Sequence, residues 1–226
     1  MERSGTVDDV YAALAERVGF AQSRYVKRIF RKLLTPEDGR MLLALPKPPE
    51  ELASMFDLDV EVVKAKLDEF DRKGVAIPLE KGGVRQYFCV RNMIQVHDAT
   101  IHAILSQRYE GADYEIVRMW EQFRETEWFE LLREHEKTER HMRVIPLPGT
   151  VNGDLLPQEN LELLLREAGQ IAVVPCPCRV NRVREGQCDK PVDVCLSLTP
   201  GAVNYIAQSA TGKVLSLDEA LALLDE

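Results

Sequence analysis

Four cysteines lie within a short stretch near the C-terminal end of the chain, with the spacing C-x-C-x9-C-x6-C. They are Cys176, Cys178, Cys188 and Cys195. Four thiolates this close in sequence can close around one metal ion or cluster, and Pro177, Gly186 and Pro191 supply the bends that such a wrap requires. Since five cysteines are few for a disulfide scaffold and the polar N-terminus shows no export signal, metal ligation is favoured over two disulfides.

The spacing bears on which metal the cysteines would bind. Structural zinc sites favour C-x2-C pairs, in which the amides of a tight turn point at the sulfurs, and neither pair here has that form. A larger cluster accommodates irregular spacing because its corners are farther apart, so we expect an iron–sulfur cluster of the 4Fe-4S type, with zinc as the alternative. A third interpretation is buried or disulfide-bonded cysteines without metal. The charges available to offset a thiolate centre are Arg179, Arg182, Arg184 and Lys190, against Glu185 and Asp189.

The composition limits the class of protein. With 226 residues and 45% apolar content, the chain is long enough for one large domain or two small ones with proper cores. Its apolar runs fall far short of the roughly 20 residues that a membrane span needs, so we expect a soluble, cytoplasmic protein without membrane contact. The net charge of −8 repels a phosphate backbone, and nucleic-acid binding would require a local basic face.

The first half of the chain predicts helices followed by a hairpin. Apolar periodicity and capping signals predict helices over 7–20, 25–33, 35–45, 49–56 and 60–73, and Gly74 ends the last of them. Strand-like segments follow at 75–79 and 85–90, with Gly82 and Gly83 in the turn between them. Helix, turn, helix and hairpin in this order predict a winged helix-turn-helix, and Cys89 at the end of its second strand is expected to be a core residue.

The second half is predicted to be helical with little sheet. A helical region over 98–140 with a break near Gly111 precedes a linker rich in proline and glycine. After the linker we expect a helix over 158–168, a strand over 171–174, the cysteine segment, a helix over 201–208 and a final helix from Leu217. The fold class is therefore α+β, mainly helical. We predict a leading helix over 1–25, a winged helix-turn-helix domain over 26–97, a helical connector or dimerisation arm over 98–145, and a metal-binding C-terminal domain over 146–226.

The predicted recognition helix is poorly suited to DNA. Residues 59–73 hold five acids and four bases, and Asp59 and Glu61 occupy the helix start, where base-reading side chains are needed. Arg85 and Lys81 of the wing could still touch phosphates. Sequence-specific DNA binding is therefore not expected, and a protein-interaction or scaffold role for the fold is favoured.

Three segments together resemble a known family. They are Gln170-Ile-Ala-Val-Val-Pro-Cys-Pro-Cys-Arg, Gly186-Gln-Cys-Asp-Lys-Pro-Val-Asp-Val-Cys-Leu and Leu215-Ser-Leu-Asp-Glu-Ala-Leu. The chain resembles, from about Leu34 to Glu226, the anaerobic 4Fe-4S ferredoxin-type proteins with an N-terminal winged-helix domain. In that family a dicluster ferredoxin module usually follows the Cys-Pro-Cys-Arg unit, whereas this sequence ends at Glu226. The resemblance then implies either a truncated member or a short one, and a short member would have to exchange electrons with a separate redox partner protein.

The residues and the resemblance together predict an iron–sulfur electron-transfer protein of anaerobic metabolism. The alternative is a winged-helix transcription regulator that responds to metal or redox state. A third class is an enzyme whose cluster has an incomplete ligand set and binds substrate, but no acid–base pair is recognisable, so an electron-transfer or accessory role is favoured. The sequence does not specify the redox partner.

Overall fold

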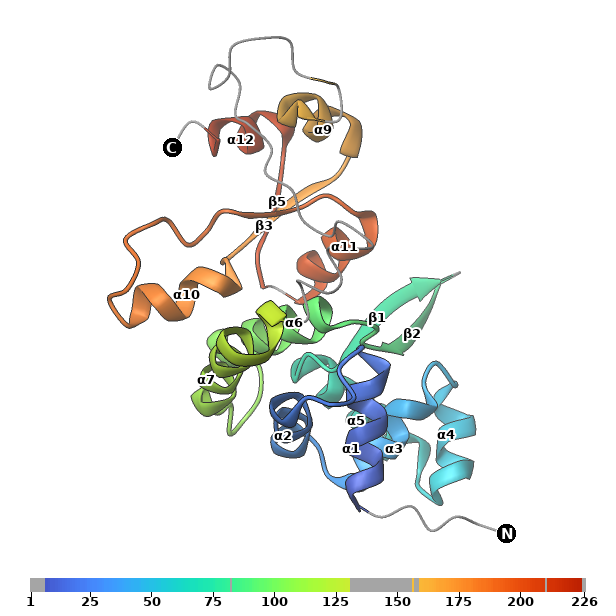
Figure 1. Cartoon of the computed structure of the whole chain (residues 1–226). Coiled ribbons are helices and arrows are strands. Elements are labelled where there is room, and N and C mark those ends of the chain that lie inside the picture. Colours follow the sequence, from blue (N-terminus) through green and yellow to red (C-terminus); the bar gives the residue numbers. More distant parts are fainter. Residues whose placement is uncertain (1–6, 82, 131–155, 157–158, 210, 225–226) are drawn as a thin grey trace. The chain divides into compact units, whose positions relative to one another are not determined.

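The computed structural model describes residues 7–81, 83–130, 156, 159–209 and 211–224, and they form two compact units (Figure 1). The N-terminal unit is Met1–Leu132 and the C-terminal unit is Arg133–Glu226. Both are mainly helical with a small antiparallel sheet, which confirms the α+β class. Residues 131–145 of the predicted connector and most of the predicted linker lie outside the described residues. None of the described helices is both long enough and apolar enough to cross a bilayer.

The N-terminal unit begins with five helices that match the sequence prediction closely. Their starts are fixed by caps: Ser23 accepts from the Val26 N–H, and Thr35 and Asp38 form a reciprocal capping box with Pro36 in the first turn. The helices are α1 (Val7–Arg17), α2 (Arg24–Leu33), α3 (Pro36–Ala44), α4 (Pro49–Phe56) and α5 (Val60–Arg72). Their apolar sides share one continuous core.

A two-stranded hairpin follows α5 directly. Strands β1 (Ala76–Lys81) and β2 (Val84–Cys89) pair antiparallel, with Ala76 opposite Cys89 and Lys81 opposite Val84. Cys89 is 2% exposed and lies in the core, as predicted. Burial raises the pKa of its thiol to about 11, which keeps the thiol protonated and unreactive.

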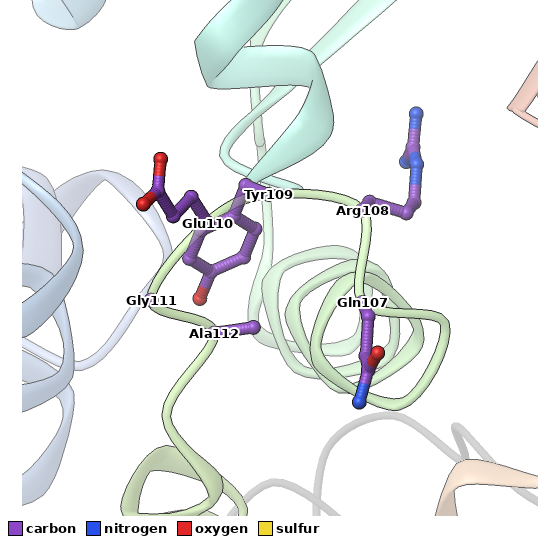
Figure 2. A pocket seen from close by; sticks show the side chains of 6 residues that line it. All are labelled: Gln107, Arg108, Tyr109, Glu110, Gly111 and Ala112. Atoms are coloured by element: carbon purple, nitrogen blue, oxygen red, sulfur yellow. The ribbon is translucent and has the colours of Figure 1, made fainter.

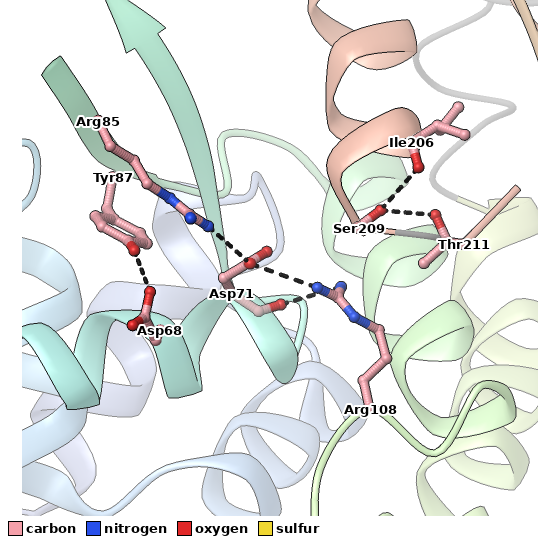
Figure 3. A network of polar contacts seen from close by, with 8 residues as sticks. All are labelled: Asp68, Asp71, Arg85, Tyr87, Arg108, Ile206, Ser209 and Thr211. Atoms are coloured by element: carbon pink, nitrogen blue, oxygen red, sulfur yellow. Dashed lines mark hydrogen bonds and ion pairs between the residues drawn. The ribbon is translucent and has the colours of Figure 1, made fainter. Parts of the chain in front are cut away.

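The hairpin is tied to α5 by a polar network (Figure 3). The Tyr87 hydroxyl donates to the Asp68 carboxylate, and Arg85 Nη2 lies 3.4 Å from Asp71 Oδ2. Arg108, from the loop after the next helix, lies 3.4 Å from the same oxygen. Burial raises the pKa of Asp71, while the two guanidinium groups oppose that shift.

Two further helices complete the core of the N-terminal unit. Helix α6 (Met93–Leu105) is capped by Asn92, so it begins earlier than the predicted start near Asp98. Helix α7 (Tyr114–Phe123) continues into a π-helical turn at Arg124–Trp128 and packs against α2. Trp120 and Phe123, each 1% exposed, are core residues with ring centroids 5.7 Å apart. The first part of the predicted connector therefore belongs to the N-terminal unit.

The C-terminal unit is a three-stranded antiparallel sheet between helices, with strand order β4-β3-β5. Ala172 and Val174 of the central strand pack against Val203 and Ile206 of α11, whereas Ile171 contacts the cluster on the opposite face that α9 and α12 supply. This alternation follows from the two-residue period of a strand. The elements are α9 (Leu161–Ala168), β3 (Ile171–Val174), α10 (Pro177–Arg184), β4 (Cys195–Ser197), α11 (Pro200–Ser209), β5 (Lys213–Leu215) and α12 (Leu217–Ala222).

Candidate metal centre

The sheet of the C-terminal unit brings the first and last cysteines together. In the antiparallel register, Cys195 at the start of β4 lies opposite Val174, the last residue of β3. The chain reaches Cys176 two residues later, and the Cys176 N–H donates to the Val192 carbonyl at 2.7 Å. This hydrogen bond falls outside the β3–β4 register and holds Cys176 against the segment that leads into β4.

Cys176 is the N-cap of helix α10, which carries the second cysteine in its first turn. Pro177 occupies the first helical position, where its missing N–H costs no hydrogen bond. Pro177, which was expected to be one of the bend residues of the cysteine segment, starts this helix. Pro177 is buried and Cys178 is exposed. The helix start places the Cys178 thiol within reach of Cys176.

Three of the four thiols meet at Cys176. The thiols of Cys178 and Cys195 hydrogen-bond with the Cys176 sulfur, and these contacts lower the pKa of Cys176 well below that of a free thiol. The nearby backbone N–H groups of Arg179 and Cys178 act in the same direction, although the sulfur makes no capping hydrogen bond of ordinary geometry. Cys176 and Cys195 are half-buried, and Cys195 packs against the core beneath α11. This arrangement stabilises a thiolate at Cys176, the form in which cysteine binds metals.

Cys188 lies at the other end of α10. The helix has eight residues, so its axis is about 12 Å long at about 1.5 Å per residue. Its C-terminal end is closed by hydrogen bonds from the Gly186 N–H to the Val183 carbonyl and from the Gln187 N–H to the Arg182 carbonyl, with Gly186 at a φ of +70°. Cys188 follows this closure and is half-buried.

One arginine ties the cysteine loop back to α10. Arg179 Nη1 donates to the Pro191 carbonyl at 2.9 Å, next to the backbone hydrogen bond between Cys176 and Val192. The charge of the segment is more balanced than the expected basic excess, because Asp193 also lies in it. Within 176–195 there are four basic and three acidic side chains, and Lys190 pairs with Asp189 at 3.6 Å. Arg179 therefore acts as a loop anchor as well as a positive charge.

The donor set fits a soft, thiolate-bound metal. Three cysteine sulfurs gather at the N-terminal end of a helix, whose partial positive charge favours anions. Across the part of the chain that the structure describes, no group of three or more histidine, cysteine, aspartate and glutamate side chains surrounds a point that could hold a metal ion.

A second concave feature lies in the loop between α6 and α7. Residues 107–112 line a pocket there (Figure 2). Burial raises the pKa of Tyr109 to about 12, and its hydroxyl has no hydrogen-bond partner among the described residues. Because one short loop forms the whole lining and Glu110 is its only carboxylate, the cysteine segment remains the stronger candidate site.

Part of this site went unrecognised in the sequence, although signals were present. Val180 and Val183 are spaced as on a helix, Arg182 and Arg184 favour a helix C-terminus, and Gly186 follows. Together with Pro177, this pattern is typical of a short helix inside the cysteine segment. Comparisons of the chain with models of protein families, with curated proteins and with solved structures find no match.

Proposed function

We propose that this chain is a cytoplasmic electron-transfer protein that binds one iron–sulfur centre through Cys176, Cys178, Cys188 and Cys195. The observation that carries the proposal is that the chain brings Cys176, Cys178 and Cys195 together where β3 ends, α10 begins and β4 starts. Such a centre, when bound, supplies one-electron transfer at a potential set by its surroundings. The electrons pass to or from a separate redox partner protein.

The surrounding residues suit a negatively charged centre. The N-terminal end of α10 directs the positive end of its dipole toward Cys176, and Arg179 holds a guanidinium group close to the same loop. Both would stabilise a thiolate-bound cluster, and they would help more after reduction adds an electron. The resemblance of the Cys-Pro-Cys-Arg unit to anaerobic ferredoxin-type proteins supports iron–sulfur over zinc.

Anaerobic purification with metal analysis tests this function. We expect brown protein containing iron and acid-labile sulfide, with a visible absorption that bleaches on dithionite, because a cluster is coloured and redox-active whereas zinc is neither. Each single serine replacement at Cys176, Cys178, Cys188 and Cys195 is expected to lower the bound iron. Aerobic handling must be avoided, since zinc can take over the thiolates of a lost cluster.

The matched control is Cys89→Ala, which removes a buried thiol in the other unit and should leave iron and sulfide unchanged. Stoichiometric zinc without iron in anaerobic protein would contradict the electron-transfer function and leave a structural metal site. A disulfide between two of the four cysteines, with iron retained by the other two, would contradict a single four-cysteine centre.

We further propose that α3, α4, α5 and the β1–β2 hairpin form a winged helix-turn-helix that serves as a platform for protein contacts. The element order and the antiparallel wing directly after α5 support it. The solvent side of α5 carries Glu61 and Val62, and Lys64 pairs with Glu61 at 2.8 Å. In the wing, Arg85 pairs with Asp71, so the positive charge that could bind a phosphate is already offset.

This platform is expected to bind duplex DNA weakly or not at all. Dissociation constants at physiological salt should be no tighter than about 1 μM and independent of sequence, because the start of α5 is acidic and its Lys64 and Lys66 are paired with Glu61 and Asp38. Fluorescence anisotropy against genomic fragments, with the protein in both redox states, measures this. Sub-micromolar, sequence-dependent binding would favour the alternative function, a metal- or redox-responsive transcription regulator.

A further inference from the structure

We infer that α2 presents a docking surface for a short acidic segment of a partner protein, whose carboxylates pair with a row of basic side chains on this helix. The surface lies in the N-terminal unit and outside the elements of the proposed winged helix-turn-helix. The inference therefore goes beyond the proposed function and does not depend on metal binding by the other unit.

The ten residues of α2 divide completely into a buried side and a basic side. The buried side belongs to the core of the unit and consists of Tyr25, Val26, Ile29, Phe30 and Leu33. The other five residues form the α2 basic face: Arg24, Lys27, Arg28, Arg31 and Lys32. Burial of the apolar side requires only that the other side be polar, and like charges four residues apart destabilise a helix. An outer side made of bases alone, in a chain with a net charge of −8, therefore indicates a use for the charge itself.

Four of these bases stand in one row along the helix. Arg24, Lys27, Arg28 and Arg31 follow the spacing i, i+3, i+4 and i+7, and the row is about 10 Å long at about 1.5 Å per residue. The Arg31 guanidinium lies over the Tyr11 ring, 5.3 Å from its centroid, which restricts where it can move. Within the described residues, the side chains of Lys27 and Arg28 form no ion pair or hydrogen bond, and Arg28 is exposed. The centre of the row can therefore accept carboxylates from outside.

Carboxylates of the chain itself bound the row at both ends. Arg24 Nε lies 3.6 Å from Glu127 Oε1, and Lys32 Nζ lies 2.7 Å from Asp113 Oδ2 and 2.5 Å from Glu115 Oε2. An extended polyanion, such as a duplex backbone or an anionic bilayer, would bring further negative charge against these flanks. A bilayer would also find no apolar side of α2 to bury, because that side lies in the core. A short segment with carboxylates at the same helical spacing pairs with the row and ends before its flanks.

The test measures binding of the full chain to a fluorescein-labelled, alanine-rich peptide with glutamates at i, i+3, i+4 and i+7, by fluorescence anisotropy. We expect binding that weakens about tenfold between about 50 mM and about 300 mM salt, because salt screens exposed charges. Arg28→Glu should weaken binding about tenfold or more, since it sets a carboxylate against those of the peptide. This variant should fold, because the new carboxylate would lie four residues from both Arg24 and Lys32.

The matched control is Arg91→Glu, which makes the same change in net charge at an exposed position outside α2. It should change the affinity for the peptide less than about twofold, because only the α2 basic face pairs with the glutamates. If circular dichroism shows that Arg28→Glu is unfolded, Arg28→Gln against Arg91→Gln gives the same comparison, with an expected loss of about threefold or more.

Three outcomes overturn the inference. One is absence of peptide binding by the wild-type chain at low salt. Another is equal weakening by Arg28→Glu and Arg91→Glu, which would mean that net charge alone governs the binding. The third is tighter binding to duplex DNA or to vesicles containing phosphatidylserine than to the peptide, which would assign the face to a nucleic acid or a membrane. None of these measurements uses iron, so they are independent of whether the proposed metal centre exists.

Discussion

Replacing Gly212 with alanine is expected to unfold the C-terminal unit and to abolish metal retention without altering a single thiol. A β-carbon at Gly212 would lie 2.2 Å from the Val173 carbonyl oxygen and 2.6 Å from Val174 Cγ1. Val173 and Val174 belong to the central strand of the sheet, which pairs on both sides and cannot retreat without breaking a ladder. We expect a loss of at least about 3 kcal/mol in the free energy of unfolding.

The matched control is Gly201→Ala in α11, where a β-carbon would meet no atom within 4 Å. Alanine in a helix with open space should change stability by less than about 1 kcal/mol, in the stabilising direction. Urea unfolding followed by circular dichroism, together with iron per chain, measures both variants. Wild-type iron content and an unchanged midpoint in Gly212→Ala would show that this approach to β3 is not tight.

The dependence of the site on the sheet explains which parts of the fold the sequence could predict. Local signals predicted most helices well: the capping box at Thr35 and Asp38, and the second one at Ser216 and Glu219, both form. These motifs act within one turn of chain, so they need no distant partner. The strand over 171–174 was predicted with its observed bounds because it is a continuous apolar run, as is typical of a strand with both faces covered, and three of its four residues are buried.

Strands β4 and β5 carry no such signal. Each has three residues, and Cys195–Ser197 becomes a strand only because β3 lies beside it. The sequence therefore predicted that the cysteines would come together but not that strand register would pair Cys195 with Val174. The prediction that four thiols share one centre stays a prediction, since three meet at Cys176 and Cys188 lies beyond α10.

The ion pairs of the wing could not be predicted from the sequence either. Counting bases along the sequence allowed Arg85 a contact with phosphate, whereas in the fold it faces Asp71, which also binds Arg108 from the loop after α6. These partners are separated by 14 and 37 residues. No local pattern encodes such pairs, and their effect on function follows from the tertiary structure alone.

The second large effect is expected from Gly74→Ala, at the junction of α5 with the hairpin. Gly74 has a φ of +74°, and a β-carbon there would lie 2.4 Å from both the carbonyl carbon and the carbonyl oxygen of Ala99 and 2.7 Å from the Thr100 nitrogen. The positive φ alone costs about 1 kcal/mol for a residue with a side chain. The added β-carbon also collides with the backbone of α6, which is fixed in the core. We therefore expect Gly74→Ala to lower the free energy of unfolding by at least about 3 kcal/mol in total.

Gly111→Ala separates these two contributions. Gly111 has nearly the same conformation, with a φ of +75°, but a β-carbon there would meet nothing within 4 Å. We expect a loss of about 1 kcal/mol for Gly111→Ala, measured by urea unfolding of the full chain. Since α5, the hairpin and α6 all meet at Gly74, its variant should lower the unfolding midpoint of the N-terminal unit, while iron bound at the proposed centre in the other unit should stay unchanged. Equal destabilisation by the two variants would mean that α6 yields to the added methyl group and that the close approach at Ala99 contributes nothing to stability.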